Sequence, residues 1–265
     1  MKHHVGSFSI GLALAGLGLA TSSYAQSSPS SDQTEAPASP PPEDVRVDVP
    51  VLAFTHSAFG ARAGKLGAHG FGSAQWAESG GAGRGGVTVY GSPFNRLTLL
   101  ATGERRLDGR YGPTASLAYR VLGSVEQGWS VAAMGAYKAE GFAEIEGEIE
   151  LGALFSMARD GWHLDVNGVA GGGLEESEEF DAETKVRGGY DATNWLRVGF
   201  DSRGRYRLRG PVLLAGDRKW DVIGGPQVTA SWSRFYGSAL VGATTVDVAS
   251  GVGAVSWLTL GGVLP

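Results

Sequence analysis

The chain has 265 residues, a formal net charge of −5 and no cysteine. The missing cysteines exclude disulfides, thiol nucleophiles and cysteine-ligated metals within this sequence, and the acidic balance argues against general binding of nucleic acid. Charged residues make up 18% of the chain and 43 residues are glycine, whereas ordinary soluble domains contain roughly 25% charged residues and about 7% glycine.

The first 25 residues have the three parts of a secretory signal peptide. Lys2 opens a positive region, an apolar run covers residues 8–20, and small residues precede a cleavage site after Ala25. A retained membrane anchor is the alternative, but the run is short for a spanning helix, which needs about 20 apolar residues. We therefore expect a signal peptide over 1–25 and an exported protein.

Residues 26–50 are rich in serine and proline and cannot bury much apolar surface, so we expect a periplasmic tether there. We assign residues 51–265 to one barrel domain. The dipeptide His56-Ser57 falls in a lead-in segment before the first strand.

Strand signals recur from residue 66 to the end of the chain. Each predicted segment alternates polar and apolar residues over about ten positions, which is the length of a tilted strand that crosses a membrane. We predict twelve segments, with ten as the alternative: 66–76, 87–91, 96–106, 112–122, 129–139, 144–157, 162–171, 183–191, 195–203, 220–232, 236–247 and 252–263.

The sixth segment has one acidic face and one apolar face, because every second residue from Glu144 to Glu150 is a glutamate. Such a row could favour cations along a pore wall, or it could pair with basic side chains inside a narrow barrel. We favour pairing. The residues predicted to line the lumen are Glu144, Glu146, Glu148, Glu150, Arg96, Arg120, Lys185, Arg187, Arg197 and Asp201.

Aromatic residues gather at one set of strand ends, as they do at a membrane interface. The predicted interface residues are Trp129, Phe155, Trp162, Tyr190, Trp195, Trp232 and Phe235. Connections at these ends are short, whereas the three longest, 77–86, 172–182 and 204–219, all fall on the opposite side. Outer-membrane barrels have short periplasmic turns and longer outer loops.

By this architecture the chain resembles the small, porin-like outer-membrane β-barrel proteins of bacteria. The resemblance implies an all-β, closed antiparallel transmembrane barrel in the cell envelope of a Gram-negative bacterium. It also implies contact with membrane lipid and lipopolysaccharide, and insertion by the barrel-assembly machinery. One departure is the C-terminal sequence, which ends in Pro265 and has Trp257 as its nearest aromatic residue, whereas many such barrels end in an aromatic.

No cofactor motif or metal-ligand spacing occurs in the sequence. His163 and Asp165 share a strand face and could meet a serine, as in outer-membrane lipid hydrolases. The acidic stretch 174–183 is expected to be a solvated loop rather than a divalent-cation site. The arginine-rich stretch 203–219 is expected in an outer loop, where it would contact lipopolysaccharide phosphates or cover the acidic stretch.

The function that we expect is a small passive channel or a structural surface protein with a charged lumen. The alternatives are a lipid-modifying enzyme of the outer membrane and a soluble secreted β-sandwich that acts as a binding module. The closure of the first strand on the last would distinguish a barrel from a sandwich.

Overall fold

The computed structural model describes residues 53–77, 80–139, 147–174, 180–209, 219–245 and 252–264. The predicted signal peptide and the tether over 26–50 lie outside these residues. The described chain forms twelve strands: β1 (Leu66–Ala77), β2 (Gly80–Phe94), β3 (Leu97–Arg106), β4 (Tyr111–Ser124), β5 (Trp129–Ala139), β6 (Gly147–Arg159), β7 (Trp162–Gly173), β8 (Phe180–Asp191), β9 (Leu196–Arg209), β10 (Trp220–Trp232), β11 (Phe235–Thr244) and β12 (Gly253–Val263).

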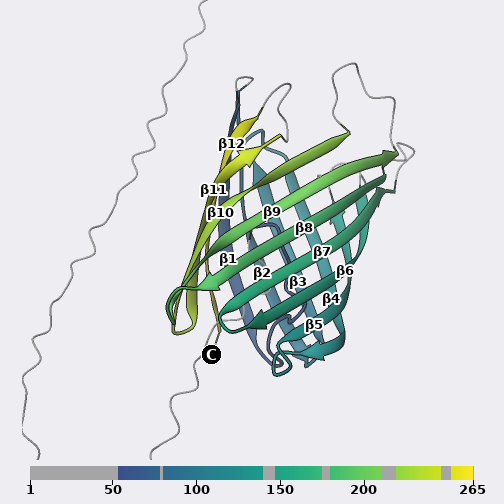
Figure 1. Cartoon of the computed structure of the whole chain (residues 1–265). Coiled ribbons are helices and arrows are strands. Elements are labelled where there is room, and N and C mark those ends of the chain that lie inside the picture. The colour runs from purple at the N-terminus through teal and green to yellow at the C-terminus, as the bar shows by residue number, and fades with distance from the viewer. Residues whose placement is uncertain are drawn as a thin grey trace, which may run out of the picture. The chain divides into compact units, whose positions relative to one another are not determined.

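Every strand pairs antiparallel with its neighbours in sequence, and β1 pairs with β12, so the sheet closes into a barrel (Figure 1). The closing register runs from Gly67 opposite Val263 to Trp76 opposite Ala254. The predicted closed antiparallel barrel of twelve strands is confirmed, and both the ten-strand alternative and the sandwich are wrong. Among the described residues no helix is long and apolar enough to cross a membrane.

The alternation seen in the sequence separates the two faces of each strand. In β6 the outward side chains Ile149 and Leu151 are exposed, whereas the inward side chains Glu150, Leu154 and Ser156 are buried. A strand sends successive side chains to opposite faces, so the apolar-polar alternation gives this barrel a largely apolar outer surface and a largely polar inner surface.

The two ends of the barrel differ in their connections. At the turn end, the hairpins that join β2 to β3, β4 to β5, β6 to β7, β8 to β9 and β10 to β11 are short. The β6–β7 turn is Asp160-Gly161, and both residues have positive φ angles, 51° and 80°. This conformation matches the twist of the flanking strands. The opposite end, the loop end, carries the longer connections, including 140–146 and 210–219.

All three of the long predicted connections are shorter than expected. β7 runs to Gly173 and β8 begins at Phe180, so both ends of the predicted connection 172–182 belong to strands. Most of 77–86 belongs to β2, which pairs with β1 from Gly80 to Gly91, and β9 extends to Arg209. The glycine-rich start of β2 has few side chains that could display alternation, although its backbone still pairs in register with β1. In β9 the arginines continue the inward row of the strand, and this row resembles a charged loop in the sequence.

Candidate functional site: the barrel lumen

The inward face of the barrel carries charges of both signs. The described inward side chains that bear charge include Arg84, Glu104, Arg120, Lys138, Glu148, Glu150, Asp165, Asp181, Glu183, Lys185, Arg187, Asp191, Arg197, Asp201, Arg203, Arg205 and Asp221. A buried charge is costly unless it is paired, so the arrangement of partners decides what this lumen can do.

The acidic row of β6 pairs with the neighbouring strand β5. The ammonium of Lys138 contacts the carboxylate of Glu150 and lies 3.9 Å from that of Glu148. Lys138 stands directly opposite Glu148 in the register of the two strands. Glu144 and Glu146, which were predicted to extend the row, lie outside the described residues. The two described glutamates are therefore partners of an inward lysine.

A second buried pair joins β7 to β8. The guanidinium of Arg187 donates from Nε and Nη2 to Oδ2 of Asp165, at 2.9 and 2.7 Å. The hydroxyl of Ser156 on β6 donates to the other carboxylate oxygen. Both side chains of the pair are at most 10% exposed, so solvent screens this interaction only weakly.

Toward the loop end, basic side chains of β8 and β9 alternate with carboxylates. Glu183 lies 2.9 Å from Lys185 and 3.8 Å from Arg203. Arg205 lies 3.5 Å from Asp181 and 3.0 Å from Asp221 on β10. Arg203 ends the predicted segment 195–203 and lies inside the barrel, whereas Arg205 was expected in an outer loop and is placed inside by the length of β9.

The other residues predicted to line the lumen lie in different environments. Lys185, Arg187 and Asp201 are buried in the interior, and Arg120 and Arg197 are half-buried on the inward side. Arg96 departs from the expectation. It is exposed in the turn between β2 and β3, because β3 begins one residue later than predicted.

Six of the seven predicted interface aromatics lie at exposed, outward positions near the turn end. The seventh, Trp195, is exposed in the β8–β9 turn and lines a cavity at that end of the lumen. Trp162 stands opposite Tyr190, and the centroids of their rings are 4.9 Å apart. A second set of exposed aromatics lies near the loop end and was not predicted: Trp76, Tyr111, Tyr137, Phe180 and Trp220. Their positions at the ends of predicted strands could have indicated this second set in the sequence. Contact of either set with lipid remains a prediction.

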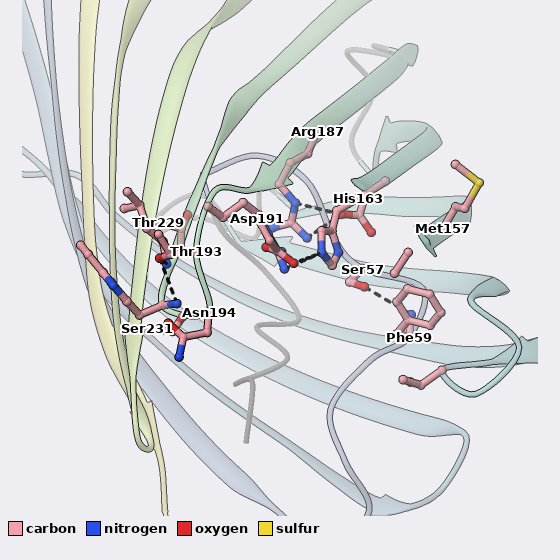
Figure 2. Close-up of a pocket in the computed structure, with 16 residues that line it drawn as sticks. Ser57, Phe59, Met157, His163, Arg187, Asp191, Thr193, Asn194, Thr229 and Ser231 are labelled. Carbon is pink, nitrogen blue, oxygen red and sulfur yellow. Dashed lines mark hydrogen bonds and ion pairs between the residues drawn. The ribbon is translucent and has the colours of Figure 1, made fainter. Parts of the chain in front are cut away.

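A cavity of about 110 Å³ opens at the turn end of the lumen. Nε2 of His163 lies 2.7 Å from the carboxylate of Asp191 and 2.9 Å from Nη2 of Arg197 (Figure 2). Arg197 also donates to Asp191 at 2.8 Å. The suggested partnership of His163 with Asp165 differs from these contacts, since Asp165 is held by Arg187. The sequence did not identify Asp191, which comes from the adjacent strand.

Residues 53–61, the lumen segment, lie inside the barrel. Asp201 accepts hydrogen bonds from the Phe54 amide at 3.1 Å and from the Thr55 hydroxyl at 2.5 Å. Asn167 accepts from the His56 amide at 2.7 Å and donates to the His56 carbonyl at 2.9 Å. The start of the lumen segment is thus held near the middle of β7 and β9.

The rest of the lumen segment is held nearer the turn end. The Ala58 amide donates to the Ser156 hydroxyl at 2.7 Å, and the Ser130 hydroxyl donates to the Ala58 carbonyl at 2.9 Å. The Ala61 amide donates to the Thr98 hydroxyl at 3.0 Å. Gly60 has a φ of 70°, and a Cβ there would overlap that hydroxyl oxygen, so glycine is required at this bend.

Apolar contacts complete the seat of the lumen segment. Phe54 meets the ring of Trp257 edge-on, with ring centroids 5.3 Å apart. Ala58 belongs to a buried cluster with five wall residues: Ala118, Ala132, Met134, Leu154 and Val169. Among the described residues no group of three or more histidine, aspartate or glutamate side chains is placed to hold a metal ion.

Comparison with known proteins finds similarity in structure alone. No protein-family model and no curated protein matches the sequence. The NanC porin superposes with a TM-score of 0.60 at 8% identity, and the KdgM porin in complex with disordered oligogalacturonate gives 0.54 at 8%. Each match covers 74% of this chain and 98% of that porin. The COG4313 outer-membrane channel of Pseudomonas putida F1 gives 0.58 at 12% identity, covering 78% of this chain and 98% of the channel. The chain therefore has the fold of small bacterial outer-membrane porins.

Proposed function

We propose that this protein is an outer-membrane channel through which small hydrophilic solutes diffuse passively. The observation that carries the proposal is the inward row of charges in a closed barrel whose outward side chains are apolar. A membrane barrel with a polar interior suits a water-filled path, and the solved proteins with this fold include porins. The turn end would face the periplasm and the loop end the cell exterior.

The pairing of the charges sets the expected selectivity. Lys138 is matched by Glu148 and Glu150, and Arg187 is matched by Asp165. Because opposite charges lie side by side along the wall, the lumen presents no continuous single-sign track over the described strands, and we expect weak selectivity between cations and anions. This pairing also accounts for the acidic row of β6 without a dedicated cation filter.

The test is ion conductance across planar lipid bilayers, with heat-modifiable migration in detergent gels as the check of folding. It uses the wild-type chain and Ala58→Asp, which places a carboxylate in the apolar pocket that seats the lumen segment. We expect discrete conductance steps, and folded protein without conductance in either form would refute a channel and leave a structural role.

Selectivity provides a second measurement on the same preparation. Glu150→Gln leaves Lys138 less compensated, so the reversal potential in a salt gradient should shift toward anion preference. Glu126→Gln is the matched control, because Glu126 is exposed in the β4–β5 turn. Equal reversal potentials for the two variants would place the ion path away from the β5–β6 wall.

A further inference from the structure

We infer that the turn-end half of the lumen is a binding site for the lumen segment, and that residues 53–61 act as a reversible plug of the channel. The inference rests on the proposed channel function. The occupant of the binding site is a segment of the same chain. The site recognises an extended peptide by holding its backbone with inward side chains.

Side chains of the barrel wall satisfy the backbone of the lumen segment. Peptide groups of Phe54, His56, Ala58 and Ala61 bond to inward carboxylate, amide and hydroxyl groups of the wall. The Phe59 carbonyl also accepts from Arg120 at 3.5 Å. A buried peptide group needs a partner, and here inward side chains of the wall supply these partners.

The contacts of the lumen segment are distributed around the barrel. The wall residues that hold the lumen segment come from six strands: Thr98 from β3, Arg120 from β4, Ser130 from β5, Ser156 from β6, Asn167 from β7 and Asp201 from β9. Phe54 also packs on Trp257 of β12. A segment bound to both sides of a narrow lumen crosses the path that a solute would take.

The contacts of the lumen segment allow it to leave the lumen. The lumen segment contributes no strand to the barrel, which closes through β1 and β12 without it. Its side chains are small or aromatic, and its bonds to the wall are hydrogen bonds and apolar contacts. The barrel can therefore keep its own pairing when the lumen segment leaves, and local opening of such a segment needs much less free energy than unfolding of the barrel.

A disulfide lock tests the plug, since the chain has no cysteine of its own. The hydroxyl oxygens of Ser57 and Ser156 lie 3.3 Å apart, so Ser57→Cys with Ser156→Cys places two thiols within bonding reach. Thr88→Cys with Thr102→Cys is the matched control, because these hydroxyls lie 2.9 Å apart on the neighbouring wall strands β2 and β3. Oxidation of the first pair should abolish channel openings and reduction should restore them, whereas the control should not respond.

A second measurement reports the position of the plug by thiol labelling. In a Ser156→Cys variant, the introduced thiol lies beneath the lumen segment, since Ser156 is fully buried. A water-soluble maleimide should label this thiol at least about tenfold faster when Ala58→Asp is added. Ala63→Asp, at an exposed position beyond the lumen segment, should leave labelling slow. Conductance should rise with Ala58→Asp and not with Ala63→Asp.

The outcomes separate the two proposals. If the wild-type chain and the locked chain conduct equally, the plug is refuted and the channel stands. If the thiol of the Ser156→Cys variant is labelled equally with and without Ala58→Asp, the plug is likewise refuted. If Ala58→Asp exposes that thiol and no form conducts, the channel function fails, and the gating role fails with it.

Discussion

Replacing Asp165 by Asn tests whether the buried charges stabilise the barrel as pairs. The substitution removes the charge that faces Arg187 but keeps an oxygen that can accept from Ser156. The carboxylate receives two guanidinium hydrogen bonds, at 2.7 and 2.9 Å, and both side chains are at most 10% exposed. Breaking one side of such a pair costs about 3–5 kcal/mol, since it leaves an uncompensated buried charge.

A double-mutant cycle separates pairing from the other effects of each substitution. Asp165→Asn and Arg187→Met should each destabilise the barrel strongly, whereas the double variant should cost less than the sum, with a coupling free energy of about 2–3 kcal/mol. The assay is urea unfolding in lipid vesicles, followed by tryptophan fluorescence. Asp108→Asn is the control at an exposed pair with Arg110 and should change the free energy of unfolding far less than Asp165→Asn does. Additive single effects, within about 0.5 kcal/mol, would refute the pairing.

Three further predictions concern the outer wall, a close strand approach and an exposed connection. Leu151→Arg, at an outward position that is 66% exposed, should lower the free energy of unfolding in vesicles by about 2–4 kcal/mol. Met157→Arg, near the turn end, should lower it by about 0–1 kcal/mol. Equal losses for the two variants would argue against a lipid-facing wall. Gly242→Ala should impair folding in heat-modifiability gels, because its Cβ would overlap the Gly224 carbonyl oxygen, while Gly204→Ala, with open space around it, should fold normally. Hydrogen bonds from Arg110 lower the pKa of Asp108. The small stabilising effect of the Asp108 carboxylate is therefore present above the ordinary pKa of about 3.9 and is lost as pH falls through the lowered pKa. Arg110→Gln should raise the pKa of Asp108 in an NMR titration, and an unchanged pKa would contradict the assigned cause.

The sequence predicts the strands well where side chains alternate and poorly where they do not. The apolar positions of β6 and the aromatic ends of β7 and β8 mark both the faces and the ends of these strands. The start of β2, from Gly80 to Gly86, has one large side chain, Arg84, so periodicity gives almost no signal there. Its strand structure comes from its pairing with β1, which is a tertiary contact that local pattern does not contain.

The lumen segment was missed for a related reason. Residues 53–61 do not alternate, and their partners are hydroxyl, amide and carboxylate groups that are distant in sequence, up to 147 residues away for Phe54 and Asp201. Each partner alone is an ordinary inward polar residue on its strand. Only closure of the barrel brings them around one segment, so the predicted lead-in before β1 becomes part of the interior.

The order of inward residues along three strands connects the plug with the acidic row. On three strands the inward row begins with a hydroxyl at the turn end and ends with charged side chains at the loop end. The row of β3 begins with Thr98, that of β5 runs from Ser130 to Lys138, and that of β6 runs from Ser156 to Glu148. The hydroxyls at the turn end bind the lumen segment, and the charges at the loop end pair with one another or with neighbours. Because a neutral hydroxyl can bond a peptide group without a charged partner, the same strands build a peptide seat at one end and a region of paired charges at the other. The glutamates of β6 therefore lie beyond the seat of the plug, where a solute entering from the loop end would meet them first.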